Sequence, residues 1–469
     1  MSNQAFDVAI IGSGPGGYRA AVLAALRGLK AAIIERGSWG GTCLNRGCVP
    51  KKAWYQTARL LAGKDQLAAR GLQGVLVPDL AQAWRDQRRI VETVRASYLD
   101  YLERLGVRTY VGDARLRAAD EIEVAGGEVV HAASVVVATG STPLVPPALA
   151  LHPDRVLTTD ALFDHPPPRG KRIAVVGSGV IGTEMAFILA MLGLEVVWLT
   201  QSEALSRSRY STPALKLLRA ALHSHGIVPR TGNRPVAATV ENDGVRLSLP
   251  RGREEKVDWV LVAAGRAPCT SGIGLDAAGV ACDEDGYIRV DEYQRTSTAS
   301  IYAIGDCANH AMTSNHALAE ASVAIANIVA PASARRSDAP IPQVVYSALE
   351  LARVGLSEDE AESAGREVAT GFAALETSPA ALALGDRRGF ARLVGDADSG
   401  ELLGAEAVGL HAGEWIHVVS ACAGRPDAFA RLAGIRYNHP SLAEEILNAT
   451  ETLAARWGFG DRVFGIRRE

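Results

Sequence analysis

Two stretches of the chain share one pattern of hydrophobic and polar positions. Residues 6–37 read FDVAIIGSGPGGYRAAVLAALRGLKAAIIERG, and residues 171–201 read KRIAVVGSGVIGTEMAFILAMLGLEVVWLTQ. Each has a short apolar run, a glycine-rich turn, a longer run with the spacing of an amphipathic helix, and a second apolar run. Each stretch therefore predicts a strand, a turn, a helix and a strand. The repeat predicts an α/β protein that contains two such units.

The glycines of the first turn have the spacing that a dinucleotide needs. Gly12 permits a tight turn, Gly14 lets the backbone approach a pyrophosphate, and Gly17 lets the helix pack closely on the strand. The phosphates would lie at the helix N-terminus, where unpaired N–H groups and the helix dipole favour anions. Glu35 ends the second apolar run, where a carboxylate can accept hydrogen bonds from a ribose. We therefore expect a dinucleotide site here.

The second turn predicts another nucleotide site with a different ribose contact. Its glycines have the same spacing, at Gly177, Gly179 and Gly182. The position that corresponds to Glu35 is Thr200, so this site lacks the ribose-binding acid. Gln201 follows, and Arg207 and Arg209 come shortly after. This pattern favours the 2′-phosphate of NADPH and leaves NADH open.

A third segment carries one more candidate for a nucleotide contact. Residues 296–328 predict a strand that runs into Gly305 and Asp306, followed by a helix. The Asp306 carboxylate can hydrogen-bond a ribityl or ribose hydroxyl. A simple turn residue is the alternative.

Composition limits the class of protein and its partners. The 469 residues exceed what one core usually supports, which predicts two to four domains. A net charge of −3 without a basic cluster argues against nucleic-acid and membrane binding. The N-terminal residues lack the pattern of a signal peptide and no long uncharged apolar stretch follows, so we expect a cytoplasmic location. The proline-rich stretches 164–171 and 330–342 are expected linkers.

Two of the six cysteines lie close together, Cys43 and Cys48 in GGTCLNRGCVPKK. Six cysteines are too few for a disulfide scaffold, and no second Cys or His pair lies nearby to complete a zinc site, so no metal is expected. The spacing alone leaves two interpretations open, a reactive pair or two buried thiols. The other four are expected to be buried small hydrophobes, Cys269, Cys282, Cys307 and Cys422.

Together these motifs resemble those of the flavin-dependent pyridine nucleotide–disulfide oxidoreductases, the family of dihydrolipoamide dehydrogenase, glutathione reductase and mercuric reductase. The resemblance covers nearly the whole chain through ordered motifs: GSGPGG, GGTCLNRGCVPKK, VVVATGS, GSGVIGTE, AAGRAPCT, IYAIGDC and YNHPSLAEE. It implies an α/β fold with two Rossmann-like dinucleotide-binding domains, for FAD and for NAD(P), and a C-terminal α+β dimerisation domain. The implied boundaries are 1–147 for FAD binding, 148–269 for NAD(P), 270–335 for a segment that completes the FAD domain, and 336–469 for the interface.

The resemblance also implies roles for the cysteine pair and for further cofactor contacts. Cys43 would be the outer thiol that exchanges with substrate, and Cys48 the inner thiol beside the flavin. A disulfide that closes so small a loop adds only about 2 kcal/mol of stability, so it opens readily and stores two electrons. A helix that begins near these cysteines would lower the thiol pKa. The implied cofactor residues include Arg36, Gly41, Thr42, Thr139, Gly140, Gly265 and Arg266.

The remaining implied catalytic residues lie in three separate motifs. Lys51 or Lys52 would approach the flavin, and Glu184 would pair with it. His439 would act as acid and base, and Glu444 would orient its ring. In the family this pair acts on the other subunit's cysteine, which implies a homodimer.

The motifs leave the substrate open among three interpretations. A dihydrolipoamide-dehydrogenase-like enzyme is favoured, because the family position of a glutathione-binding Arg is Val22 here. An NADPH-dependent reductase of another small disulfide, of glutathione reductase type, is the second. The third is a flavoprotein subunit that docks to a lipoyl-carrying complex. The expected partners are accordingly a small dithiol or disulfide, or a lipoyl-carrying protein, and electrons can flow in either direction.

Overall fold

The computed structural model describes residues 5–458 and 460. The chain divides into two compact units. The first unit comprises Met1–Trp54, Asp79–Gly170 and Pro235–Ser337, and the second comprises Tyr55–Pro78, Lys171–Arg234 and Asp338–Glu469. Both predicted proline-rich linkers contain a boundary between the units. The division into domains at 147, 269 and 335 stays a prediction.

A central sheet organises the first unit. Its strand order is β3-β2-β1-β6-β5-β4, and β16 pairs with β6. The strands β1, β2, β3, β6 and β16 are parallel neighbours, and β4 and β5 add an antiparallel edge. The strands are β1 (Ala5–Ile11), β2 (Ala31–Glu35), β3 (Arg108–Val111), β4 (Ala114–Leu116), β5 (Glu121–Val124), β6 (Glu128–Val137) and β16 (Ile301–Ala303).

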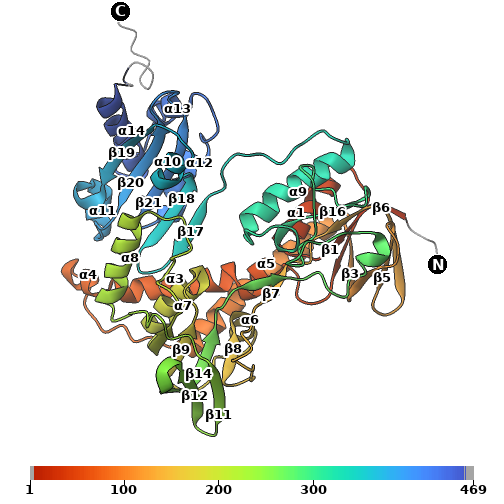
Figure 1. Ribbon diagram of the computed structural model, residues 1–469, viewed down its shortest axis with the longest axis horizontal. Coiled ribbons are helices and arrows are strands. Elements are labelled where there is room, and N and C mark those ends of the chain that lie inside the picture. Colours follow the sequence, from red (N-terminus) through yellow and green to blue (C-terminus); the bar gives the residue numbers. More distant parts are fainter. Residues whose placement is uncertain (1–4, 459, 461–469) are drawn as a thin grey trace, which may run out of the picture. The chain divides into compact units, whose positions relative to one another are not determined.

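Strands β2 and β16 and the second half of β1 are buried on both faces of the sheet, which explains their nearly continuous apolar runs. On one face α1 (Pro15–Leu26) and α9 (Ser314–Val329) lie side by side (Figure 1) and share a core with Ile10 and Ile33. On the other face Ile11 and Ile34 pack against residues 273–308. The parallel strands end near Gly12, Ala138 and Ile304, and ligands of open α/β sheets bind beyond this edge.

Further elements complete the first unit. Two helices carry the cysteine pair, the short α2 (Gly41–Arg46) and the start of α3 (Cys48–Ala62). The others are α5 (Leu80–Arg104), α6 (Thr159–Asp164), the pair β8 (Val156–Thr158) and β14 (Trp259–Val262), the pair β7 (Ser141–Pro143) and β15 (Arg266–Pro268), the sheet β11 (Ala237–Glu241), β12 (Gly244–Leu249) and β13 (Arg253–Val257), and the 3-10 helices η1 (Pro250–Gly252), η2 (Asp276–Ala278) and η3 (Gly305–Cys307).

The second unit contains the second copy of the predicted repeat. It forms β9 (Arg172–Val176), α7 (Val180–Met191) and β10 (Glu195–Leu199), with the two strands parallel. The helices α4 (Lys64–Ala69) and α8 (Thr212–Ser224) belong to the same unit. The α7 segment is buried over most of its surface, in keeping with its strongly apolar sequence.

A five-stranded antiparallel sheet forms the rest of the second unit, in the order β17-β18-β21-β20-β19. Helices α12 and α14 pack on it around one core that includes Leu393, Trp415 and Ile446 (Figure 1). The elements are β17 (Gln343–Tyr346), β18 (Glu350–Gly355), α10 (Glu358–Ser363), β19 (Val368–Ala374), η4 (Leu375–Thr377), α11 (Pro379–Leu384), β20 (Phe390–Asp396), β21 (Leu402–Val408), α12 (Ala412–Ser420), α13 (Ala428–Gly434) and α14 (Glu444–Trp457).

Candidate active site

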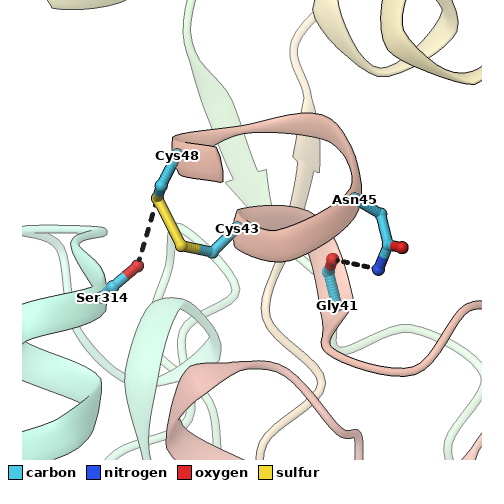
Figure 2. Close-up of a disulfide and its surroundings, with 5 residues drawn as sticks. All are labelled: Gly41, Cys43, Asn45, Cys48 and Ser314. Carbon is cyan, nitrogen blue, oxygen red and sulfur yellow. Dashed lines mark hydrogen bonds between the residues drawn. A yellow bond between two sulfur atoms is a disulfide. The ribbon is translucent and has the colours of Figure 1, made fainter. Parts of the chain in front are cut away.

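The cysteine pair forms a disulfide at the junction of two short helices (Figure 2). Cys43 lies in α2, Cys48 is the first residue of α3, and their Cα atoms are 4.7 Å apart. Cys43 is half-buried and Cys48 is exposed. Because Cys48 begins a 15-residue helix, the positive end of the helix dipole favours a thiolate at this position. The pairing of the two sulfurs is thus a structural finding, while their separate outer and inner roles stay predictions.

Asn45 holds the turn that carries the disulfide, a role that the sequence motifs did not reveal. Its buried side-chain amide donates to the carbonyl oxygens of Ser38, Trp39 and Gly41 at 3.3, 3.0 and 2.8 Å (Figure 2 shows the last). Its Oδ1 accepts two hydrogen bonds from the Arg95 guanidinium, at 3.2 and 2.6 Å. The donors of this amide thus hold the segment before Cys43, and its oxygen joins the turn to α5.

The first glycine turn has the predicted close contacts. A Cβ on Gly17 would lie 1.9 Å from the Gly12 carbonyl oxygen, and a Cβ on Gly12 would lie 2.4 Å from the Ala138 oxygen. At Gly14, in contrast, no atom lies within 4 Å of the Cβ position. Gly14 is also the N-cap of α1, and no side chain caps this helix. The N-terminus of α1 is therefore open to an anion.

Glu35 lies at the end of β2 beside this turn and is buried. One carboxylate oxygen accepts from the Ser13 amide at 2.9 Å and the Ser13 hydroxyl at 2.6 Å, and the other accepts from the Gly37 amide at 2.8 Å. A carboxylate offers about four acceptor positions, so these bonds orient Glu35 and leave room for a ribose hydroxyl. Ser13 was not predicted, because a serine inside a glycine turn gives no distinct signal.

Asp306 is positioned by a chain of side chains from separate strands. Its Oδ2 accepts from the Ser141 hydroxyl at 2.6 Å, and that hydroxyl accepts from Arg266 Nε at 2.8 Å. Arg266 also reaches the Ser141 carbonyl at 2.9 Å and Asp160 at 3.3 Å. Arg266 thus supports the Ser141 hydroxyl that bonds Asp306, and its predicted direct contact with a cofactor stays a prediction.

The other predicted residues of the first unit lie near the same sheet edge or beside the redox turn. Gly41 and Gly140 have positive φ angles of 61° and 72°, and Thr42 is the second residue of α2. Arg36 Nη2 lies 3.5 Å from Cys269 Sγ. Two more predicted residues follow strands β6 and β14, Thr139 and Gly265.

The second glycine turn repeats the geometry of the first. A Cβ on Gly182 would lie 2.3 Å from the Gly177 carbonyl oxygen, and no atom lies within 4 Å of the Cβ position of Gly179. Gly179 caps α7 without a side-chain hydrogen bond. Thr200 follows β10 and is buried, whereas Gln201 is exposed.

The two arginines after this strand differ in their surroundings. Both side chains are exposed, and Arg209 also forms an ion pair with Glu360 at 3.1 Å. Arg209 is thus engaged by the protein, and Arg207 is the better candidate for a phosphate contact.

Glu184 is fully buried on α7, and its Oε1 accepts the Tyr346 amide at 2.8 Å. Lys51 and Lys52 lie on the first turn of α3. Their predicted pairing with Glu184 stays a prediction.

His439 and Glu444 form the predicted pair. His439 Nδ1 lies 2.9 Å from Glu444 Oε1, and the other carboxylate oxygen accepts the Ser441 amide at 2.7 Å. The hydrogen bond from His439, and then that from the Ser441 amide, lowers the pKa of Glu444. The carboxylate is therefore ionised near neutral pH and fixes Nδ1 as the nitrogen that carries a proton. The imidazole is 72% exposed, so it is accessible to a reacting group.

Comparison with known families gives this arrangement a context. A family model described as pyridine nucleotide-disulphide oxidoreductase matches residues 6–325. The dimerisation domain of the same family matches residues 341–450. The chain belongs to this family. It therefore carries the dimerisation domain of these enzymes, which supports a homodimer.

Similar proteins cover almost the full length of the chain. A dihydrolipoyl dehydrogenase of Thermus scotoductus is 36% identical over 96% of this chain and 98% of its own. A glutathione reductase of Burkholderia cepacia is 32% identical over 95% and 99%. Among solved structures, LpdA from Mycobacterium tuberculosis superposes with a TM-score of 0.88 at 24% identity, over 95% of this chain and 98% of that one.

These findings confirm the predicted fold class and the reaction type. The fold has two Rossmann-like dinucleotide-binding domains and a C-terminal α+β dimerisation domain. The chain is an FAD-dependent enzyme that passes electrons between NAD(P)H, flavin, a redox disulfide and a dithiol or disulfide substrate. In the described part of the chain, no helix is long and apolar enough to cross a membrane.

The residues of the first unit fit FAD. The α1 N-terminus lacks a side-chain cap, Gly14 leaves open space, and Glu35 and Asp306 are held at the same sheet edge. The α7 N-terminus with Gly179 fits a nicotinamide dinucleotide on the same grounds.

Proposed function

We propose that the protein exchanges electrons between a nicotinamide and a small lipoyl-type dithiol or disulfide, in the manner of dihydrolipoamide dehydrogenases. The observation that carries this proposal is the Cys43–Cys48 disulfide at the start of α3. Relatives named dihydrolipoyl dehydrogenase support the lipoyl group as substrate. Val22 adds support, because it is buried on α1 and offers no charge to a glutathione carboxylate.

In this proposal the sulfurs of Cys43 and Cys48 have different roles. FAD, which Gly12, Gly14 and Gly17 would hold, supplies two-electron transfer between a hydride and a dithiol. Cys43 exchanges with the substrate sulfur, and Cys48 is held as a thiolate by the N-terminus of α3.

His439 moves the proton that thiol–disulfide exchange requires. Because Nδ1 contacts Glu444, Nε2 is the nitrogen that accepts a proton from the attacking thiol and returns it to the leaving thiolate. Glu444 stabilises the imidazolium that forms in between. We propose that this pair acts on the Cys43 of the partner subunit, so that the dimer is the active form.

A kinetic screen of the purified yellow protein tests the proposal. The substrates are lipoamide and glutathione disulfide, each with NADH and with NADPH. Turnover of lipoamide at least about tenfold above that of glutathione disulfide is expected, while activity with neither would contradict the proposal. Cys43→Ser should retain flavin and lose thiol turnover, and Cys282→Ser, at a half-buried cysteine outside the pair, should retain both.

A second candidate function is an NADPH-dependent reductase of another small disulfide. Thr200 leaves β10 without a ribose-binding acid, and Arg207 is exposed just beyond it. If Arg207 contacts the 2′-phosphate, Arg207→Gln should raise the KM for NADPH about tenfold or more and leave the KM for NADH unchanged. Lys216→Gln, an equal charge change at an exposed position on α8, is the control. If Arg207→Gln changes the KM for NADH and the KM for NADPH equally, Arg207 does not support an NADPH-dependent enzyme.

A third candidate is a flavoprotein subunit that serves a lipoyl-carrying complex. This role predicts weak turnover of free lipoamide, strong turnover of a lipoylated carrier domain, and stable co-purification with that carrier. Similar kcat/KM values for free and protein-bound lipoyl groups would argue against it.

A further inference from the structure

The first residue of α9 reaches the redox disulfide. Ser314 Oγ lies 3.5 Å from Cys48 Sγ, within the range of a hydrogen bond to sulfur (Figure 2). In the disulfide Cys48 carries no S–H, so the Ser314 hydroxyl is the donor and the sulfur is the acceptor. The contact joins α3 to a helix that is 266 residues further along the chain.

The structure of α9 leaves the Ser314 hydroxyl available for this bond. The capping residue of the helix is Thr313, whose hydroxyl accepts the His316 amide and lies 2.7 Å from His316 Nδ1. Deeper in the helix, the buried Glu320 accepts the Gly305 amide at 2.7 Å. The start of α9 is thus fixed by other side chains, and Ser314 is not needed as a cap.

The electrostatic surroundings of the Cys48 sulfur favour negative charge. Two helices, α3 and α9, begin at the two residues in contact, Cys48 and Ser314, and each presents the positive end of its dipole. On α9 burial lowers the pKa of His316, so this ring is neutral near neutral pH and adds no positive charge to these surroundings.

We propose that Ser314 is a positioning residue that sets the reduction potential of the Cys43–Cys48 couple, which rests on the proposed role of this disulfide. Reduction by NAD(P)H through the enzyme's own reaction breaks the S–S bond and takes up two electrons and one proton. Cys43 becomes a thiol and Cys48 a thiolate. A hydroxyl bonds a thiolate more strongly than a disulfide sulfur, so Ser314 favours the reduced form.

The test measures the equilibrium of the holoenzyme with dithiothreitol buffers under anaerobic conditions. Differential alkylation and mass spectrometry quantify the oxidised and reduced pair. Ser314→Ala should shift the equilibrium about tenfold toward the disulfide, which equals about 30 mV for a two-electron couple. Ser322→Ala is the matched control, because this hydroxyl lies on the same helix and donates to the Leu318 carbonyl.

A second pair of variants separates the hydrogen bond from packing. Ser314→Thr keeps the hydroxyl, and Ser314→Val replaces it with a methyl group of similar shape. The reduction potential of Ser314→Thr should stay close to that of the wild type, and the potential of Ser314→Val should match that of Ser314→Ala. The thiolate absorbance of the reduced protein should appear at a higher pH in Ser314→Val than in the wild type. The proposed role of Ser314 is wrong if Ser314→Thr and Ser314→Val have equal reduction potentials. It is also wrong if the equilibrium constant of Ser314→Ala stays within about twofold of the wild-type value.

These outcomes are distinct from a failure of the proposed function. If NAD(P)H does not reduce the wild-type disulfide, the function is wrong, while the dithiothreitol equilibrium still reports the effect of Ser314.

Discussion

At the scale of single residues, the amide of Asn45 fixes the segment that presents Cys43. Asn45→Ala removes the two N–H donors that three carbonyl oxygens share and leaves the Arg95 guanidinium without its Oδ1 acceptor. Leaving a buried polar group unsatisfied costs about 1–3 kcal/mol, and these partners are half-buried, so we expect a lower melting temperature and a kcat that falls about tenfold. Gln82→Ala, on the exposed side of α5, should change neither. A wild-type kcat in Asn45→Ala would show that the turn keeps its conformation without the Asn45 side chain.

The carboxylate of Glu444 predicts a dependence of stability on pH. Its pKa is lowered in the folded chain by His439 and by the Ser441 amide. A group with a lowered folded pKa stabilises the protein above its unfolded pKa, and this contribution is lost as the pH falls through the folded pKa. We therefore expect the difference in unfolding free energy between the wild type and Glu444→Gln to be largest near neutral pH and to shrink in acid. Denaturant titrations across this range measure it, and a constant difference would contradict the expectation.

At the scale of elements, two glycines of the turn between β1 and α1 differ in the space that a side chain would find. Gly17→Ala places a Cβ 1.9 Å from the Gly12 carbonyl oxygen, so α1 must move away from β1. Gly14→Ala meets no atom within 4 Å and has a φ of −60°, which any residue adopts. Gly17→Ala should destabilise the apoprotein by about 1–3 kcal/mol, as overpacking does. Gly14→Ala should leave apoprotein stability unchanged and weaken FAD retention, which flavin absorbance after gel filtration reports.

The repeated elements could be predicted from sequence, and most of the contacts that hold the site could not. The apolar runs around residues 6–35 and 172–199 have a local period, which is why β1, α1, β2 and their second copies appear where the pattern places them. The bonds from Arg95 to Asn45 and from Ser141 to Asp306 join residues 50 and 165 positions apart. The local pattern of hydrophobic residues contains no information about such distant pairs. They form only when the fold brings the two segments together.

At the scale of the whole molecule, the proposed active site requires two subunits, and this can be tested by mixing variants. Cys43→Ser and His439→Gln homodimers should each be inactive. In a hybrid dimer one of the two sites combines an intact Cys43 with an intact His439 from the partner. Random exchange makes half of the dimers hybrids, so about one quarter of wild-type activity should return. If mixing restores no activity although hybrids form, each subunit uses its own histidine.

The disulfide that joins α2 to the first residue of α3 also gives the enzyme a built-in protection. Only Gly47 separates the two helices, and the Cα atoms of Cys43 and Cys48 are 4.7 Å apart. When a small thiol forms a mixed disulfide with one of these two cysteines, the other cysteine is close enough to attack that bond at a very high effective concentration. It expels the adduct and closes the ring before further oxidation can follow. The enzyme can thus clear S-thiolation from its own centre without a separate repair protein.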